Sequence, residues 1–220
     1  MFKEGLFSLI FTGLLETLYM TLVSTIMAYV IGLPVGMFLA VTDKEGIKPM
    51  PTVNKIVGGI VNILRSVPFV ILLVAIMPLT RLVTGTAIGS TATIVPLVIA
   101  AAPFVARLVE GSAKEVDRGV VEASLSMGSS TMEVVWKVLL PEAKPSLIVG
   151  AAIATTTILG YTTMSGFTGG GGLGTIAINY GYYRSQTVMM LIMVVVLVLI
   201  VQVFQEVGNF IANKCDKRIR

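Results

Sequence analysis

Long apolar runs alternate with short polar stretches along the 220 residues of the chain. An apolar run of about 20 residues is long enough to cross the hydrocarbon core of a membrane as a helix. The pattern therefore predicts five spans, at approximately residues 17–42, 56–80, 90–110, 146–165 and 186–206. The residues ahead of the first span, 1–16, are predicted to form a separate short amphipathic helix at the membrane surface.

Two of the predicted spans contain residues that are unusual inside a membrane. Pro34 is predicted to kink the first span, where neighbouring helices can satisfy the carbonyl group that it frees. Arg65 lies within the second span, where an arginine costs about 3 kcal/mol to insert. This arginine either makes a structural ion pair or backbone contact, or lines a transport path or contacts a loop. The sequence leaves both interpretations open.

The third span ends in a charged pair. Pro96 and Pro103 are expected to make this helix irregular, and Arg107 and Glu110 follow near its end. Residues three apart lie on one face of a helix, so this arginine and this glutamate are expected to form an ion pair.

The fourth span is rich in alanine, threonine and glycine. Small residues let helix backbones approach closely, so this span is expected to pack inside the bundle. Its threonine hydroxyls are expected to bond to their own or a neighbouring helix, or alternatively to line a path for a small amphiphile. In the second interpretation, Tyr161 and Met164 near the outer end are candidate gate residues. The threonines are Thr155, Thr156, Thr157, Thr162 and Thr163.

A glycine-rich run, GGGGLG, occupies residues 169–174. It lacks the following lysine and the serine or threonine of a phosphate-binding P-loop, and no strand is predicted before it. It is expected to form a tight turn outside the cell between the fourth and fifth spans, or alternatively a gate or a docking site for a binding protein. Tyr180, Tyr182 and Tyr183 beside it are typical of an aromatic belt at a membrane interface.

The segment 113–144, between the third and fourth spans, carries the longest series of closely spaced charges. Asp117 is predicted to cap a short helix that begins at Arg118, because its carboxylate can accept from exposed backbone N–H groups. Gly128 is predicted to end this helix, since glycine adopts the left-handed conformation at no steric cost. One apolar face is predicted on it, formed by Val116, Val120, Ala123 and Met127.

A second short helix is predicted to follow the glycine. Ser130 and Glu133 have the spacing of a capping box at its start, and Pro141 is expected to end it. Its apolar face is also too short to form an independent core, and consists of Met132, Val135, Trp136 and Leu139. Two helices joined by a turn, outside the apolar spans, indicate a surface on which another protein docks.

The composition supports a membrane protein and excludes several other classes. Only 13% of the residues are charged, against about 25% in soluble domains, so residues 1–220 are expected to form a single transmembrane domain. There is no histidine and Cys215 is the single cysteine, so the usual general base and metal ligand and an internal disulfide are missing. We therefore expect no catalytic residue and no metal site, and we interpret the net charge of +4 as a topology signal rather than as a sign of nucleic-acid binding.

Positive charges also set the expected orientation, because cytoplasmic loops are enriched in lysine and arginine. Three lysines follow the first span, five basic residues lie within residues 107–144, and four lie after the fifth span. The opposite side carries only Lys3, Arg81 and Arg184. The N-terminus is therefore expected outside, and the charged segment and the C-terminus inside.

The charged segment resembles a known sequence motif. Glu122-Ala123-Ser124, three residues, Gly128, nine residues and Val138-Leu139-Leu140-Pro141 are similar to the EAA motif of ABC-importer permeases, whose pattern is E-A-A, three residues, G, nine residues, I-x-L-P. Ser124 replaces the second alanine and Val138 the isoleucine, while the spacing is intact. The resemblance implies that residues 113–144 form the coupling helices, which seat in a groove of a cytoplasmic ATPase subunit. The implied coupling residues are Glu122, Ala123, Ser124, Gly128, Val138, Leu140 and Pro141.

Other runs resemble the permease subunits of bacterial methionine ABC importers. They are ETLYMT (16–21), IGLPVG (31–36), NILRSVPF (62–69), AAPFVAR (101–107) and GGGGLG. The resemblance implies an all-α integral membrane protein, a type I ABC-importer permease with five transmembrane helices in the bacterial inner membrane. It also implies two copies of this chain, two ABC ATPase subunits and an extracytoplasmic methionine-binding protein or lipoprotein.

The same resemblance implies how such a permease works. ATP and Mg bind to the partner ATPases, the coupling helices are drawn together, and the permease switches from inward- to outward-facing. The chain itself is then no enzyme and holds no cofactor, and its remaining contacts are with membrane lipid.

Three alternatives remain open at this point. The chain could import another small amino acid or amphiphile, or be a standalone secondary carrier, although no internal repeat is evident and Arg65 is the one ionisable residue well inside a span. It could also be a membrane scaffold whose charged segment only tethers a soluble partner. For the motif itself, the alternative is an ordinary cytoplasmic linker whose spacing arose by chance.

Overall fold

The computed structural model describes the backbone of residues 2–215 and the side chains from Gly5 onward. Throughout this range the chain forms helices joined by short turns, with no strand. The basic tail residues Lys217, Arg218 and Arg220, which entered the charge argument for orientation, lie outside the described residues, as does the side chain of Lys3.

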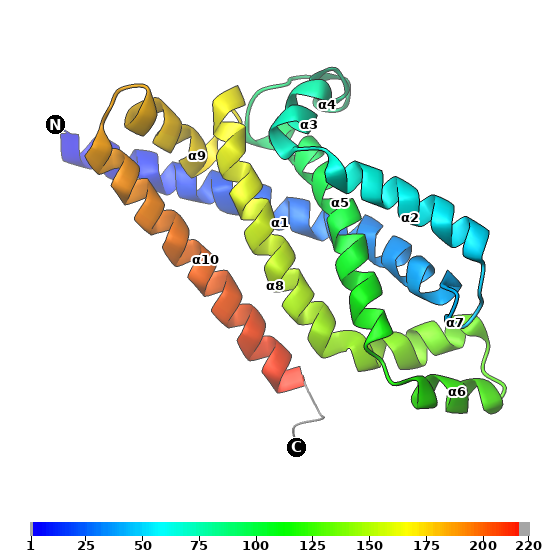
Figure 1. The fold of residues 1–220 in the computed structure, drawn as a ribbon. Helices are drawn as coiled ribbons and strands as arrows, with labels where there is room; N and C mark the ends of the chain where they lie inside the picture. Colours follow the sequence, from blue (N-terminus) through cyan, green and yellow to red (C-terminus); the bar gives the residue numbers. More distant parts are fainter. Residues whose placement is uncertain (1, 216–220) are drawn as a thin grey trace. The chain divides into compact units, whose positions relative to one another are not determined.

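Four long apolar helices dominate the described chain (Figure 1). They are α1 (Phe2–Thr42), α5 (Ser90–Lys114), α8 (Leu140–Met164) and α10 (Thr187–Cys215). Among the described residues, four helical runs are long and apolar enough to cross a membrane, and a bent pair of helices would bring the number to five. Four of the predicted spans are thus confirmed as long apolar helices.

The predicted surface helix over residues 1–16 is not a separate element. α1 runs without a break from Phe2 to Thr42 and stays α-helical through Pro34. Its first half is held by contacts that the sequence did not reveal: Gly13 lies against the backbone of Gly172 and the side chain of Ile176. A large side chain at position 13 would prevent this close approach.

The predicted second span, residues 56–80, is interrupted. α2 (Pro51–Ser66) ends before Pro68, and α3 (Phe69–Ala75) begins after it. Pro68 has no N–H group and disfavours the helical conformation of the residue before it, Val67, so a bend forms there. These two helices are the bent pair, a broken span or a re-entrant segment. A further helix, α4 (Met77–Thr84), follows and ends at Gly85, whose φ is 77°.

The remaining elements are short. α6 (Arg118–Ser126) and α7 (Thr131–Val134) lie between α5 and α8, and a π-helical segment, η1 (Val135–Leu139), joins α7 to α8. After α8 come a 3₁₀ turn, η2 (Ser165–Thr168), then α9 (Gly172–Ile176) and a second π-helical segment, η3 (Ala177–Tyr182). The prolines of α5 do not make it irregular, because it is α-helical throughout.

The chain divides into two compact units, each with its own apolar core. The first unit contains residues 1–27, 67–101 and 155–205, and its core joins α9 to α10 through Leu173, Ile176, Met189 and Met193. The second unit contains residues 28–66, 102–154 and 206–220. One of its clusters joins α1, α2 and α5 through Leu39, Val61 and Ala106, and another lies beneath α6 and α7.

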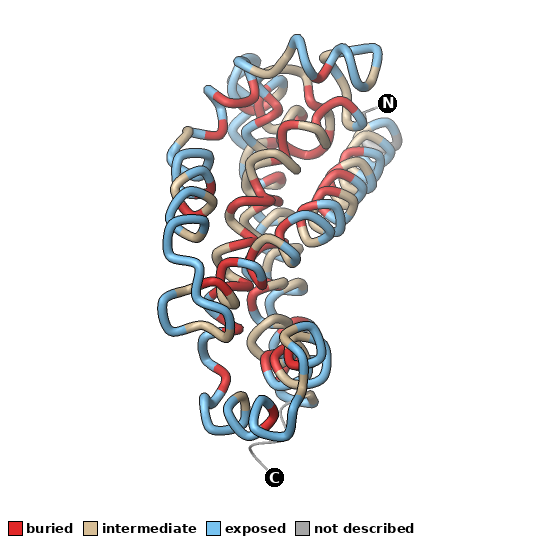
Figure 2. Tube along the Cα trace, turned by 90° about the vertical axis from the view of Figure 1, so that its right-hand side faces the viewer, coloured by how far each residue is buried: buried red, intermediate tan, exposed pale blue. Residues whose placement is uncertain are grey.

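Burial differs strongly among the apolar helices (Figure 2). In the most apolar stretch of α5, 56% of the residues are buried, against 11% in α10. α5 is therefore a packed helix of the protein interior. The exposed apolar residues of α10 suit a surface that faces lipid or another membrane protein.

Candidate functional site

The charged segment folds locally as its sequence predicts. Asp117 caps α6, because its Oδ1 accepts from the backbone N–H of Gly119 at 2.7 Å. Gly128 follows α6 in the left-handed region, with φ at 85°. The predicted capping box is present at the start of α7: Oε2 of Glu133 accepts from the backbone N–H of Ser130 at 3.0 Å, and Ser130 Oγ accepts in return.

The predicted end of the second helix at Pro141 is wrong. The helix continues from α7 through η1 into α8, so the segment and the predicted fourth span form one helical run, Thr131–Thr168. A proline ring inside an α-helix would clash with the carbonyl four residues earlier, here Lys137. The wider turn of η1 precedes the proline and relieves this clash. α7 is thus joined to α8 without a flexible linker.

α6, α7 and η1 divide their apolar residues between a buried and an exposed face. The buried cluster beneath them consists of Val134 and Leu139, with Val116 ahead of α6 and Ala143 at the start of α8. Several residues of the predicted apolar faces are instead exposed: Val120, Met127, Met132 and Trp136. Met127 is 80% exposed and Trp136 64% exposed, so neither side chain packs into an apolar core of this chain. We call these four residues the exposed apolar face.

The residues of the EAA-like motif occupy different positions on these helices. Glu122 and Ala123 are exposed on α6, whereas Ser124 is buried and its Oγ bonds to Ser129 Oγ at 3.0 Å. Gly128 and Pro141 are exposed, and Val138 and Leu140 are half-buried. The motif therefore combines residues that shape the two helices with residues that lie on their surface.

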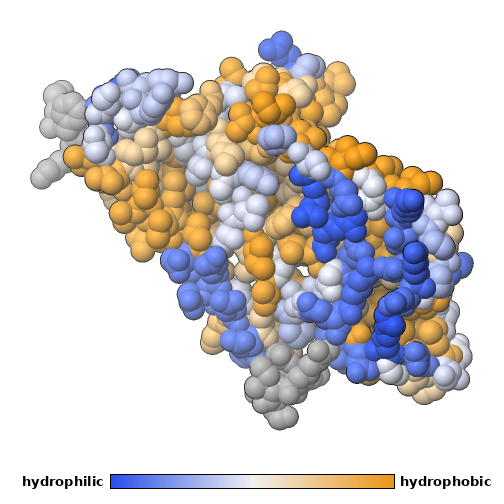
Figure 3. Space-filling model, in the orientation of Figure 1, coloured by the Kyte–Doolittle hydropathy of each residue, from blue (hydrophilic) through white to orange (hydrophobic). Residues whose placement is uncertain are grey.

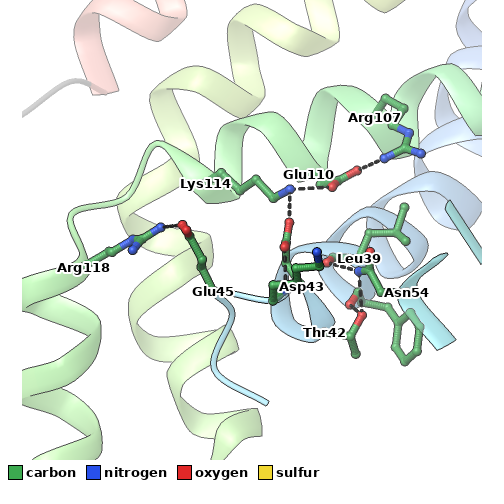
Figure 4. A network of polar contacts seen from close by, with 11 residues as sticks. Leu39, Thr42, Asp43, Glu45, Asn54, Arg107, Glu110, Lys114 and Arg118 are labelled. Atoms are coloured by element: carbon green, nitrogen blue, oxygen red, sulfur yellow. Dashed lines mark hydrogen bonds and ion pairs between the residues drawn. The ribbon is translucent and has the colours of Figure 1, made fainter. Parts of the chain in front are cut away.

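A network of ion pairs lies beside α6 (Figure 4). The predicted pair of Arg107 and Glu110 forms, with Nη1 and Oε2 2.5 Å apart. Lys114 Nζ lies 2.8 Å from Oε1 of the same glutamate and also pairs with Asp43. Hydrophilic residues gather over this part of the surface (Figure 3). Sequence spacing could reveal the first pair, but not the contacts between distant segments.

The network reaches two further elements. Arg107 Nη2 donates to the backbone carbonyl of Gly58 at 2.8 Å and to Oδ1 of Asn62 at 2.9 Å, and both acceptors are on α2. At the other end, Arg118 of α6 pairs with Glu45, in the connection between α1 and α2. The hydrogen bond from the Lys114 ammonium holds the pKa of the Asp43 carboxyl below its usual value.

The three candidate pathway residues are not brought into one site. The guanidinium of Arg65, in the last turn of α2, lies 5.8 Å from the centre of the Phe104 ring, a cation–π distance. In the other unit, Tyr161 stacks on Phe69 with ring centres 4.6 Å apart, and Met164 is 42% exposed. Arg65 thus has a structural contact, and a role in a path stays a prediction for all three.

The glycine-rich run turns at residues 169–171 and then enters α9, and its residues are buried or half-buried, while its position outside the cell stays a prediction. The carboxylate of Glu16 accepts from the backbone N–H of Gly172 at 2.6 Å, and Thr17 Oγ1 accepts from that of Leu173 at 2.9 Å. On α8, the hydroxyls of Thr162 and Thr163 donate to carbonyls of their own helix, which confirms the structural interpretation for these two threonines.

Several apolar helices long enough to span a membrane, together with a structured charged segment that exposes an apolar face, indicate a membrane protein with a docking surface for another protein. Residues 32–220 match the family described as the inner membrane component of binding-protein-dependent transport systems. The chain belongs to this family, and is thus a multi-pass inner membrane protein.

Individual relatives are more specific than the family as a whole. The chain is 44% identical to the probable D-methionine transport system permease protein MetI of Vibrio cholerae, over 96% of this chain and 93% of that protein. It is 48% identical to the D-methionine transport system permease protein MetI of Escherichia coli K12, over 74% and 76% of the two chains.

Solved structures agree with these relatives. A chain from inward-facing crystal structures of the MetNI methionine ABC transporter superposes with a TM-score of 0.96 at 45% identity, covering 98% of this chain and all of that chain. A chain from an amino acid ABC transporter with histidines superposes with a TM-score of 0.73 at 19% identity. The second similarity concerns the fold alone.

Proposed function

We propose that this chain is the permease subunit of an ABC importer that moves methionine into the cytoplasm. The observation that carries the proposal is the exposed apolar face on α6, α7 and η1, in a segment that keeps the spacing of the EAA motif. Exposed apolar side chains beside charged ones are typical of a protein interface. The methionine assignment is supported by similarity to methionine permeases over nearly the whole chain.

In this proposal the exposed apolar face docks on an ATPase subunit, with Glu122, Ala123, Gly128 and Pro141 on the same surface. The ATPase binds ATP and Mg, and hydrolysis takes place there. We call residues 113–144 the docking segment. Closure of two ATPases then draws together the docking segments of two permease copies. Because α7 continues into α8 through η1, movement of the docking segment passes directly into a long apolar helix.

The proposed complex therefore holds two copies of this chain, two ATPases and an extracytoplasmic methionine-binding protein or lipoprotein. Each copy has five spans: the long helices α1, α5, α8 and α10, and the bent pair α2–α3. Its N-terminus lies outside and its C-terminus inside. The positive charges of residues 107–144 support this orientation, since they favour the cytoplasmic side.

Tyr161 and Met164 are proposed gate residues, and Arg65 a proposed residue of the path. Met164 is the most direct position to test, because its exposed side chain can be enlarged without a change in the core. A charged or bulky residue at 164 should reduce uptake more than it reduces the amount of protein in the membrane. Equal loss of both would remove Met164 from the gate.

The proposal is tested by reconstituting the chain with the ATPase and binding protein encoded near its gene and measuring uptake of labelled methionine. Uptake that depends on ATP and on the binding protein supports the whole proposal. ATP-dependent uptake of a different amino acid or amphiphile would keep the importer and replace the substrate. Uptake that does not require ATP would indicate a secondary carrier.

A further inference from the structure

The docking segment is joined covalently to only some of the helices. α6 follows α5 after residues 115–117, and α7 continues into α8. α1 and α2 have no such link, because the connection between them, residues 43–50, is far from α6 in the sequence. A displacement of α6 would therefore reach α5 and α8 through the backbone, but α1 and α2 only through non-covalent contacts.

Between α6 and the connection itself, ion pairs supplement the apolar packing. Arg118, the first residue of α6, pairs with Glu45 of the connection, and Lys114 at the end of α5 pairs with Asp43. A hollow of 460 Å³ lies between the connection and α6, and all four of these residues line it. Ile47 packs against the apolar cluster beneath α6. The ion pairs therefore bridge a space that is only partly filled by packing.

The same network continues into α2. Glu110 is buried, with 6% of its surface exposed, and lies between Arg107 and Lys114. Arg107 then holds α2 through Gly58 and Asn62. A buried carboxylate held by two cations resists rearrangement, because a buried charge that loses its partners is strongly destabilising. This part of the network is suited to move as one body.

The pair of Arg118 and Glu45 is different. Their side chains are 68% and 70% exposed, and exposed pairs contribute little to folding stability. The contact nevertheless is the direct bond between α6 and the connection. Its position suits a role in transmitting movement rather than in maintaining the fold.

We infer that Glu45 and Asp43 are positioning residues, which make the α1–α2 connection follow α6 so that movement of the docking segment reaches α1 and α2. This inference rests on the proposed function, because it assigns a path for the coupling that the function requires. In the coupled complex the α1–α2 connection moves with α6, whereas without these ion pairs it no longer follows α6.

The first test compares Glu45→Gln and Arg118→Gln with Lys137→Gln, in the complete complex. Lys137 forms an ion pair with Glu133 on the same segment, at 3.0 Å and with both side chains exposed, and serves as the matched control. We expect methionine uptake per ATP hydrolysed to fall at least about fivefold in the first two variants, with complex assembly retained. The control should stay near wild type.

Charge reversal separates a specific pair from general damage. The double variant Glu45→Arg/Arg118→Glu should recover most of the uptake per ATP that each single reversal loses. Unchanged coupling in the single variants, an equal loss in the control, or failure of the double variant to recover would overturn the inference. Loss of ATPase binding in Glu45→Gln would also overturn it, since the residue would then act in docking.

A second measurement does not depend on the substrate. Cysteines placed at 45 and 118, in a Cys215→Ser background, should be joined by a short bismaleimide in both the nucleotide-free and the ATP-bound complex. Loss of the cross-link on ATP binding would show that the connection does not follow α6. If the wild-type complex imports no methionine, the proposed substrate fails while this measurement still decides the inference.

Discussion

The backbone N–H of Leu140 donates to the carbonyl oxygen of Val135, five residues earlier in the chain. This bond closes the wide helical turn that lets Pro141 lie within a continuous helix. α7, η1 and α8 are consequently one helical body, and a rotation or shift of α7 must move α8. The account of coupling depends on this continuity.

Inserting two glycines between Leu139 and Leu140 should therefore uncouple the protein. Glycine is about 1 kcal/mol worse than alanine in a helix, so the insertion creates a flexible joint. We expect ATPase binding to persist and uptake per ATP to fall at least about fivefold. The same insertion between Gly85 and Thr86, where the chain already turns, is the control. Full uptake by the first variant would show that α8 receives no movement from α7.

Substitutions in the exposed apolar face should weaken ATPase binding, whereas substitutions at buried positions of the same segment should lower stability. Trp136→Ala removes a side chain that is 64% exposed, so it should weaken ATPase binding while thermal unfolding of the isolated permease changes little. Val134→Ala, at a fully buried position on the same segment, should lower the melting temperature because it leaves a cavity. Co-purification with the ATPase and thermal unfolding in detergent measure the two effects. Undiminished ATPase binding by the Trp136 variant would place the docking surface elsewhere.

Gly128 is required because of its backbone conformation, not because a side chain would lack room there. Its φ is 85°, yet nothing lies within 4 Å of the position that a Cβ would occupy. Gly128→Ala should cost about 1–2 kcal/mol of strain. Gly59→Ala is a matched control in equally open space, and it should be neutral or stabilising because Gly59 is helical. Equal melting temperatures for the two variants would contradict this explanation.

The sequence predicts the local structure of the docking segment well and its surroundings poorly. The cap at Asp117, the turn at Gly128 and the capping box at Ser130 depend on neighbours within four residues, so the spacing is sufficient to predict them. The course of the chain at Pro68 and Pro141 is not local in this way. One proline interrupts a predicted span and the other lies inside a helical run, directly after a wide turn.

Contacts between distant segments form a second group that the sequence could not predict. Arg107 and Glu110 are three residues apart and were expected to pair, whereas Asp43 and Lys114 are 71 positions apart. Nothing in composition or periodicity connects such residues. Glu16 was likewise assigned to the end of a surface helix, because its partner, the Gly172 N–H, is 156 residues away.

The contact of Glu16 predicts the stability of the glycine-rich run. A hydrogen bond to a charged group contributes about 1.5–3 kcal/mol, so Glu16→Ala should increase hydrogen exchange of the backbone amides in residues 169–176. Glu16→Gln keeps an acceptor oxygen and should give an intermediate result. Mass spectrometry of the exchanged protein measures both. Unchanged exchange in the alanine variant would show that packing of Gly13 and Ile176 holds the run without the carboxylate.

The ion pair of Asp43 and Lys114 should make the stability of the protein depend on pH. Because its pKa is lowered in the folded state, its pair with Lys114 stabilises the protein above the unfolded pKa of about 4, and the contribution is lost as the pH falls through the folded pKa. The difference in melting temperature between wild type and Asp43→Asn should be constant from about pH 5 to 8 and shrink below about pH 4. A difference that vanished near neutral pH would exclude this pair as its source.

The central claim is that the segment 113–144 converts the work of an ATPase into methionine import. The most direct test measures ATP-driven uptake of labelled methionine by the reconstituted complex, comparing wild type with Glu122→Ala and Gly128→Glu. The account predicts uptake by the wild type and its loss in both variants, while both still insert in the membrane. Uptake that continues unchanged in the variants, or without ATP, would contradict it.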